Sequence, residues 1–163
     1  MKLAKGDMWE ALEGSDLFCI TTNAQVRKDG ALVMGRGIAL QATRRVPGLQ
    51  AKAGEWLREH GLVGKRYGLA TPYGTLHPRY PIGLFQVKYH WRDEADLGLI
   101  EYSVTALNQW CEDWWVERGQ FPDHEWPSVH LNFPGIGNGR LARADVLPLL
   151  EPLPDCVTVW EYA

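Results

Sequence analysis

Two glycine-rich segments, far apart in the chain, contain the residues best suited to hold a ligand. The first glycine loop runs from Gly30 to Gln41 and the second glycine loop from Phe133 to Leu141. Each follows a strand-like run and leads into a helix-like run. Glycine lets backbone N–H groups approach a ligand closely, and a helix N-terminus adds partial positive charge. Two such loops facing each other would hold a diphosphate from both sides, so the pair indicates a phosphate-bearing nucleotide.

Neither loop carries a common nucleotide-binding motif. The Gly-Lys-Ser/Thr sequence of a P-loop is absent from both. The second loop has Gly135-Ile-Gly137-Asn-Gly139, which lacks the third spaced glycine of a dinucleotide fingerprint and comes too late in the chain. For either loop alone, a turn that merely needs glycine is the alternative. The prediction therefore depends on the two loops acting together.

The elements expected around the loops alternate between strands and helices. Asp16 to Thr22 is a short apolar run typical of a buried strand, and Asp96 is expected to cap the longest helix. The order predicts an α/β fold, a three-layer α/β/α sandwich with a central mixed β-sheet, in one domain spanning 1–163. Both loops then lie at the carboxyl edge of the sheet, where ligands bind in such folds. The expected strands span 3–4, 16–22, 67–70, 82–88, 129–133 and 157–162, and the expected helices span 38–45, 48–60, 96–114 and 142–150.

Composition narrows the class of protein. The net charge of −3 over 163 residues argues against a general electrostatic grip on nucleic acid. No signal-peptide pattern or run of membrane-spanning length occurs, so we expect a cytoplasmic protein without membrane contact. Cys19, Cys111 and Cys156 have unrelated spacings, which indicates buried thiols in a reducing compartment. We expect no metal, no cofactor and a monomer.

Short segments in the right order resemble the macrodomain family of ADP-ribose-binding α/β/α modules. Gly6-Asp7-Met8 resembles the family's N-terminal Gly-Asp-Ile, whose aspartate recognises the adenine amino group. Thr22-Asn23-Ala24 resembles the Asn-Ala segment that contacts the distal ribose. The matches span residues 6 to 146, which is nearly the whole chain.

Three longer segments extend the resemblance. Residues 34–41, Met-Gly-Arg-Gly-Ile-Ala-Leu-Gln, are similar to the Met-Gly-x-Gly-Ile-Ala loop of the DNA-antitoxin and terminal ADP-ribose glycohydrolase branches. Residues 134–139, followed by Asp145-Val146, resemble the family's phosphate loop and the helix after it. Residues 88–92, Lys-Tyr-His-Trp-Arg, are similar to a segment of small phage and bacterial macrodomain proteins.

The resemblance implies ADP-ribose, or a molecule that carries it, as the ligand. The aspartate at position 7 accepts from an exocyclic amine, which guanine does not offer in the same place. Adenine also needs a stacking partner, for which Phe133, Trp160 and Tyr162 are the alternatives. The implied ligand-binding residues are Asp7, Met8, Asn23, Ala24, Met34, Gly35, Arg36, Gly37, Ile38, Pro134, Gly135, Ile136, Gly137, Asn138, Gly139 and Arg140.

The catalytic pair of the lysine-based glycohydrolases is missing. Their lysine position is occupied by Thr43, followed by Arg44 and Arg45, and none of these can form a Schiff base. The position of their aspartate is occupied by Arg140. Hydrolysis by an activated water remains, with Asn23 holding the distal ribose. The acid–base candidates are Asp29, Lys88, His90 and His77. Asp29-Gly30 is alternatively a turn dipeptide, Lys88 an ion-pair partner of Asp93 or Glu94, and each histidine an ordinary surface or core residue.

Three functions follow from these residues. The first is ADP-ribose binding with hydrolysis of ADP-ribosyl conjugates or of ADP-ribose-1″-phosphate. The second is a non-catalytic ADP-ribose reader or sponge, for example in phage–host conflict. The third is a nucleic-acid-binding or scaffold protein on the same fold, which the acidic charge and the intact ligand loops disfavour.

Overall fold

The protein is described here from a computed structural model, which describes residues 1–74, 77, 79–119, 123 and 125–162. Its strands form one six-stranded sheet of order β1-β6-β5-β2-β4-β3. Neighbouring strands are parallel except β3 and β4, which are antiparallel, so the sheet is mixed as predicted. The strands are β1 (Lys2–Lys5), β2 (Leu17–Thr22), β3 (Leu69–Ala70), β4 (Ile82–Gln86), β5 (Val129–Asn132) and β6 (Val157–Glu161).

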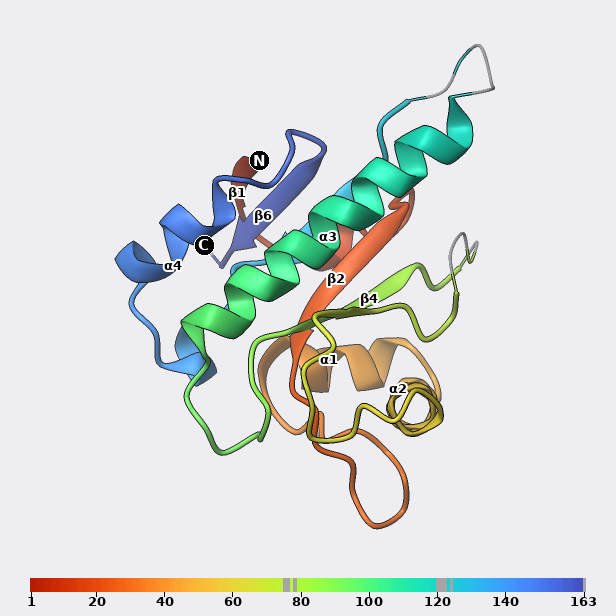
Figure 1. The fold of residues 1–163 in the computed structure, drawn as a ribbon, viewed down its shortest axis with the longest axis vertical. Helices are drawn as coiled ribbons and strands as arrows, with labels where there is room; N and C mark the ends of the chain where they lie inside the picture. The colour runs from red at the N-terminus through yellow and green to blue at the C-terminus, as the bar shows by residue number, and fades with distance from the viewer. Residues whose placement is uncertain (75–76, 78, 120–122, 124, 163) are drawn as a thin grey trace.

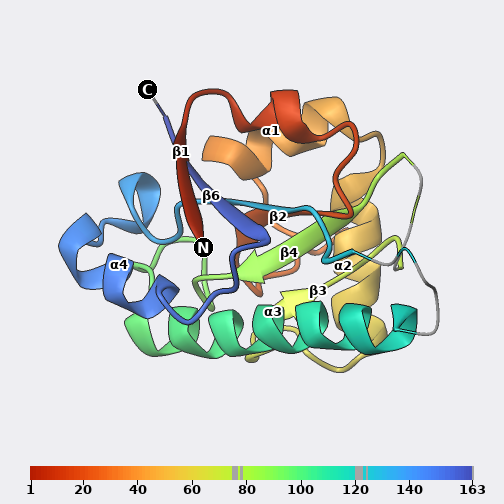
Figure 2. The ribbon, with the colours of Figure 1, turned by 90° about the horizontal axis from the view of Figure 1, so that it is seen from above.

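Helices cover both faces of the sheet. The α-helices are α1 (Gly37–Arg45), α2 (Leu49–Glu59), α3 (Leu97–Arg118) and α4 (Arg143–Leu150), and the 3₁₀ turns are η1 (Met8–Ala11) and η2 (Gly137–Gly139). Seen from above, α1 and α2 lie on one side of the sheet and α3 and α4 on the other (Figure 2). This confirms the three-layer α/β/α sandwich. Among the described helices, none is long and apolar enough to cross a membrane.

The central strand β2 is apolar along most of its length because helices cover it on both faces. Leu17 and Cys19 pack into the core beneath α3 and α4, while Phe18 and Ile20 pack into the core beneath α1 and α2. Successive side chains of a strand point to opposite faces, so a strand covered on both sides needs apolar residues throughout. Figure 1 shows α3 crossing the sheet in front of β2.

The strand pair at the edge of the sheet is shorter than predicted. β4 ends at Gln86, so Lys88 lies beyond the strand. The side chain of Gln86 is fully buried, and its Oε1 accepts hydrogen bonds from Tyr67 N at 2.7 Å and Gly68 N at 3.0 Å. Gln86 N also donates to Gly68 O at 2.8 Å, but Gly68 has φ 75°, outside the extended region, so residues 67–68 do not extend β3. A side-chain contact of this kind leaves no periodic signal in a sequence.

Two helix boundaries follow the predicted chemistry. The carboxylate of Asp96 accepts a hydrogen bond from Leu99 N at 2.8 Å and caps α3, as expected for an N-cap aspartate. Helix α1 ends at Arg45, and Val46 is extended before Pro47. Proline disfavours helical dihedrals in the residue before it, which explains this end. The turns η1 and η2 were not predicted.

Candidate functional site

The two glycine loops meet at the carboxyl ends of β2, β4 and β5. A Cβ atom on Gly37, at the end of the first loop, would lie 3.0 Å from the side-chain Nδ2 of Asn138 in the second loop. Gly37 itself has φ 57°, in the left-handed region that favours glycine. Segments separated by a hundred positions in the sequence are therefore in contact here. This junction is the centre of the candidate site.

Helix α1 begins at the junction. Its N-cap residue, Arg36, is extended and makes no side-chain capping hydrogen bond. The first N–H groups of an α-helix have no partner within the helix, and they carry the positive end of its dipole. Residues 35–37 are exposed. The start of α1 is thus suited to an anion such as a phosphate group.

The second loop does not lead directly into a helix, which corrects the expectation from sequence. It closes on itself, with Leu141 N donating to Gly135 O and Arg140 N donating to Gly137 O, each at 2.9 Å. Helix α4 starts only at Arg143. Arg140 has φ 61°, an uncommon left-handed conformation for a residue other than glycine. The N–H groups of Arg140 and Leu141, like that of Gly139, which donates to Ile136 O at 3.2 Å, are thus used within the loop. Backbone N–H groups for a ligand would come from the earlier residues of the loop and not from the N-terminus of α4.

The glycines of the second loop have different reasons to be glycine. A Cβ on Gly135 would lie 2.7 Å from Ile100 of α3, and one on Gly139 would lie 3.0 Å from Ala95. Both glycines are buried, so they serve close packing against the start of α3. Gly137 is exposed, has φ 62°, and a Cβ there would meet nothing within 4 Å. Of these three glycines, Gly137 is the one that leaves open space for a ligand.

Lys88 ties the second loop to the segment that follows β4. Its ammonium group donates to Asn138 O at 3.0 Å and to Trp91 O at 3.4 Å. A second hydrogen bond joins the same two segments, because Arg140 Nη2 donates to Arg92 O at 3.0 Å. The segment 88–92, identified from sequence as a motif, is thereby held alongside the second loop.

Three cationic side chains gather around the junction although the chain is acidic overall. Burial lowers the pKa of Lys88 from its ordinary value, and the charges of Arg140 and Arg36 lower it further, whereas Asp93 raises it. An anion bound among these cations would offset their mutual repulsion. The junction therefore combines backbone N–H groups with positive charge, which is the chemistry of a phosphate site.

A second part of the site lies beside η1 and the ends of β5 and β6. Asp7 is exposed and caps η1, with Oδ1 accepting from Trp9 N at 3.0 Å. Gly6 N donates to Glu161 O at 2.9 Å, which brings the start of η1 against the end of β6. A cavity of about 20 Å³ lies here, lined by Gly6, Met8, Trp9, Ile38, Asn132, Trp160, Glu161 and Tyr162.

The structure separates the three aromatic residues predicted to stack on a base. Trp160 and Tyr162 line the small cavity. Phe133 is only 4% exposed and packs in the core beneath α3 and α4, so its ring is not available to a ligand. The prediction that Phe133 stacks on the base is wrong. Its side chain lies on the face of the sheet covered by α3 and α4, whereas the small cavity is lined by residues of η1 and α1.

Asn23 is buried and already hydrogen-bonded within the protein. Its Nδ2 donates to Val33 O and its Oδ1 accepts from Gln25 N, both at 2.9 Å. One amide N–H remains for a ribose hydroxyl, since the amide carries two donors. The neighbouring Ala24, like Met8 and Met34, is buried in the core beneath α1 and α2. The side chains of these three residues are therefore not exposed to a ligand.

Two predicted acid–base residues have local structural partners. Asp29 is paired with Arg27 and accepts from Ala31 N at 3.1 Å, and the hydrogen bond from Arg27 lowers the pKa of its carboxyl, which makes it a weaker base. His90 Nδ1 accepts from Arg92 N at 3.1 Å.

Thr43 stands at the position of the family's lysine. Its Oγ1 donates to Leu40 O of its own helix at 2.7 Å.

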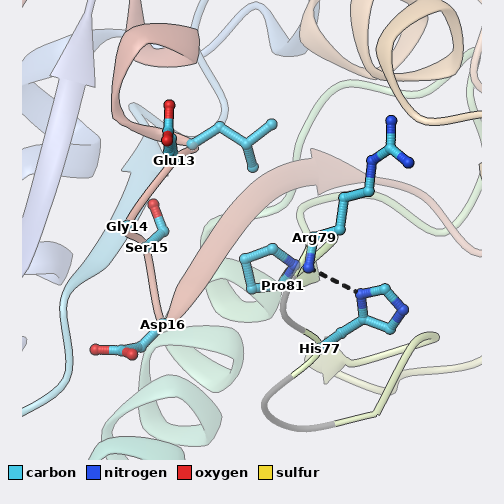
Figure 3. A pocket seen from close by; sticks show the side chains of 8 residues that line it. Glu13, Gly14, Ser15, Asp16, His77, Arg79 and Pro81 are labelled. Atoms are coloured by element: carbon cyan, nitrogen blue, oxygen red, sulfur yellow. Dashed lines mark hydrogen bonds between the residues drawn. The ribbon is translucent and has the colours of Figure 1, made fainter.

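A larger cavity of about 430 Å³ lies at the other end of β2 and β4, away from the junction. It is lined by residues 12–16, which precede β2, and by His77, Arg79 and Pro81, which precede β4. In Figure 3 the Asp16 side chain points away from Arg79, while Glu13 and Arg79 both extend toward the top of the view. His77 Nδ1 accepts from Arg79 N at 3.2 Å. His77 is therefore remote from the glycine loops, and the acid–base role considered for it there is wrong.

Sequence reasoning missed four polar or aromatic residues of the smaller cavity region. Trp9 Nε1 donates to Gln41 Oε1 at 2.7 Å, and Gln41 Nε2 donates to the hydroxyl of Tyr162 at 2.9 Å. Asn132 bonds Thr21 through both amide atoms. A polar residue closing an apolar strand run was a usable signal for Asn132. Gln41 was noted only as the end of the first glycine loop. Trp9 and Glu161 had no local signal, because their contacts join segments distant in sequence.

Solved structures show a clear relationship, although no family model and no curated protein matches the chain. The macrodomain of Thermus aquaticus DarG is 28% identical with a TM-score of 0.65, covering 99% of this chain and 97% of its own. The macrodomain of Mycobacterium tuberculosis DarG is 28% identical with a TM-score of 0.66, covering 98% and 96%. Thermosipho africanus DarTG, solved in complex with ADP-ribose, is 20% identical with a TM-score of 0.66; this chain is covered to 99% and spans 41% of that chain.

The sheet order, the two helical layers and the paired glycine loops together define an α/β/α macrodomain. The chain has the fold of a macrodomain, and it is similar to the macrodomains of two DarG proteins.

Proposed function

We propose that the protein binds ADP-ribose, either free or as the end group of a modified molecule. The contact between Gly37 and Asn138 carries this proposal, because it brings two glycine loops and the start of α1 to one point. A diphosphate at that point receives backbone N–H groups from both loops and the charge of Lys88, Arg36 and Arg140. The similarity to a DarTG structure that contains ADP-ribose supports the same ligand.

The two halves of the ligand extend in opposite directions from the loop junction in this proposal. Adenine lies toward Asp7 and the cavity lined by Trp160 and Tyr162. The distal ribose lies toward Asn23, whose remaining amide N–H is a donor for a hydroxyl. A cavity of about 20 Å³ has room for roughly one water molecule. Binding of adenine therefore requires Tyr162, which is 69% exposed, to move away from Gln41.

Calorimetry with purified protein tests the proposal. We expect ADP-ribose to bind and GDP-ribose to bind at least tenfold more weakly, because the Asp7 carboxylate accepts from the adenine amino group but would face the carbonyl oxygen of guanine. No heat with ADP-ribose at millimolar concentration would overturn the proposed ligand. Equal affinity for the two nucleotides would overturn the role of Asp7 alone.

We propose hydrolysis of the bond at the distal anomeric carbon as a second function, supported by Lys88. Water would add to that carbon while the leaving group departs with the bonding electrons and takes up a proton. An ammonium group at the loop junction would stabilise the negative charge that develops on the departing group. Lys88 would then act electrostatically and would not replace the family's Schiff-base lysine.

Turnover assays on four substrates test this second function. The substrates are ADP-ribose-1″-phosphate, O-acetyl-ADP-ribose, ADP-ribosylated protein and ADP-ribosylated thymidine in DNA. We expect Lys88→Met to lower kcat at least 100-fold on the substrate that is turned over. Lys52→Met removes an exposed lysine from α2 and is expected to leave kcat unchanged. Binding of ADP-ribose without turnover of any of the four would leave the reader function in its place.

A further inference from the structure

Trp160 lines the cavity in which we propose that adenine binds, and it has a hydrogen-bond partner outside that cavity. The residue lies near the end of β6, and its ring packs against the core beneath α1 and α2. A Cβ atom on Gly6 would lie 3.9 Å from the Trp160 ring. The indole thus forms one wall of the cavity, opposite residues of η1 and α1.

The partner of Trp160 is His130 on the neighbouring strand β5. In the parallel register Asn132 pairs with Trp160 and His130 with Thr158, so His130 and Trp160 are diagonal neighbours on one face of the sheet. Trp160 Nε1 donates to His130 Nδ1 at 2.9 Å, and the two ring centroids are 5.9 Å apart at 47°. His130 does not line the cavity.

The second nitrogen of His130 holds the imidazole in one tautomer. Because Nδ1 accepts from the indole, the hydrogen of the neutral ring is on Nε2, which lies 3.2 Å from Ser128 Oγ. Burial lowers the pKa of His130, so the ring is neutral at pH 7. A neutral imidazole held at both nitrogens is a fixed acceptor for the indole.

We propose that His130 is a positioning residue for ligand binding, which sets the plane of the Trp160 indole at the adenine end of the site. This inference rests on the proposed binding of ADP-ribose. An indole has a single N–H donor, so one acceptor in a fixed place selects among its side-chain orientations. The plane of a ring in the wall of a base pocket decides whether it meets the base in an offset-stacked or edge-to-face contact or in neither. His130 therefore acts on the ligand through Trp160 without touching it.

A matched pair of substitutions at position 130 separates the acceptor from the bulk of the ring. His130→Asn keeps an acceptor oxygen near the position of Nδ1, and His130→Leu has nearly the same shape without one. We expect His130→Leu to raise the calorimetric Kd for ADP-ribose about two- to tenfold. His130→Asn is expected to stay within about twofold of the wild-type Kd. Equal Kd values for the two variants would overturn the proposal.

A double-mutant cycle with Trp160→Phe tests whether the effect passes through the indole. The phenyl ring has no donor, so His130→Leu is expected to cause no further loss of affinity in that background. An equal loss in both backgrounds would overturn the proposal, since the histidine would then act independently of Trp160.

Hydrogen exchange of the Trp160 indole N–H tests the hydrogen bond to His130 directly. The measurement needs neither a ligand nor a variant that folds. In the ligand-free wild-type protein we expect this N–H to exchange at least tenfold more slowly than that of N-acetyltryptophanamide. Exchange at the same rate would overturn the inference. If wild-type protein failed to bind ADP-ribose, the proposed function would fail, and the exchange measurement would still decide whether the indole bond exists.

Discussion

At the scale of single residues, Gly137 and Gly61 share a backbone conformation but differ in place. Gly137 has φ 62° and Gly61 has φ 65°, and a Cβ on either would meet nothing within 4 Å. Gly61 follows α2, whereas Gly137 lies in the second glycine loop. Valine at either site therefore brings a similar backbone strain, about 1–2 kcal/mol, without a steric clash.

We expect Gly137→Val to raise the Kd for ADP-ribose at least tenfold and Gly61→Val to leave it unchanged. The valine side chain at position 137 would occupy the open space over the loop and block close approach of a phosphate to the backbone. Calorimetry measures Kd, and urea unfolding checks that both variants lose similar stability. A Gly137→Val protein with wild-type affinity would show that the ligand does not reach this loop.

The type of a residue predicted the structural role of Asp96 but not the surroundings of the side chains of Asn23 and Phe133. An aspartate before a helical pattern needs only local chemistry to become a cap, and Asp96 does so. Asn23 donates to Val33, ten positions away, and Phe133 turns into the core beneath α3. Whether a side chain faces a ligand or the core depends on packing partners that a single sequence does not display.

At the scale of elements, the first glycine loop is held in place by α2. Gly54 of α2 lies against residues 30–31, and a Cβ on Gly54 would be only 1.9 Å from Gly30 O and 2.9 Å from Ala31 Cα. Because the contacted atoms belong to the backbone, they have no side-chain rotamer through which to move aside. The helix and the loop can pack this closely only with glycine at position 54.

We expect Gly54→Ala to lower the free energy of unfolding by about 1–3 kcal/mol, as overpacking does in a filled interior. The control is Gly98→Ala in α3, where a Cβ would meet only the Asp96 carboxylate at 3.3 Å. That change is expected to be neutral or to stabilise by up to about 1 kcal/mol, because alanine favours helix over glycine. Urea unfolding gives both values. A Gly54→Ala protein as stable as Gly98→Ala would contradict this account of the contact.

At the scale of the whole molecule, His130 links stability to pH. Its pKa in the folded state is below the ordinary imidazole value of 6.5 because of burial. The unfolded chain therefore binds more protons than the folded chain at pH values between these two pKa values. The contribution of His130 to stability is present above about pH 6.5 and is lost as the pH falls from there toward the folded pKa.

The difference in unfolding free energy between wild type and His130→Asn isolates this contribution. We expect the difference to decrease as the pH is lowered from 7.5 to 5, since asparagine does not titrate. Urea unfolding at several pH values measures it. Parallel pH dependence in the two proteins would contradict a lowered pKa for His130.

The sequence alone determined the layers of the molecule and the location of its glycine loops. Apolar runs, a capping aspartate and a helix-ending proline act over a few residues, so their effects are readable in order along the chain. The tertiary structure decided which polar groups already have a hydrogen-bond partner within the protein and which can still contact a ligand. The contacts of Gly37 with Asn138, of Trp9 with Gln41 and of His130 with Trp160 each join residues from different elements. Their partners are set by packing across the sheet, and that packing forms the candidate site.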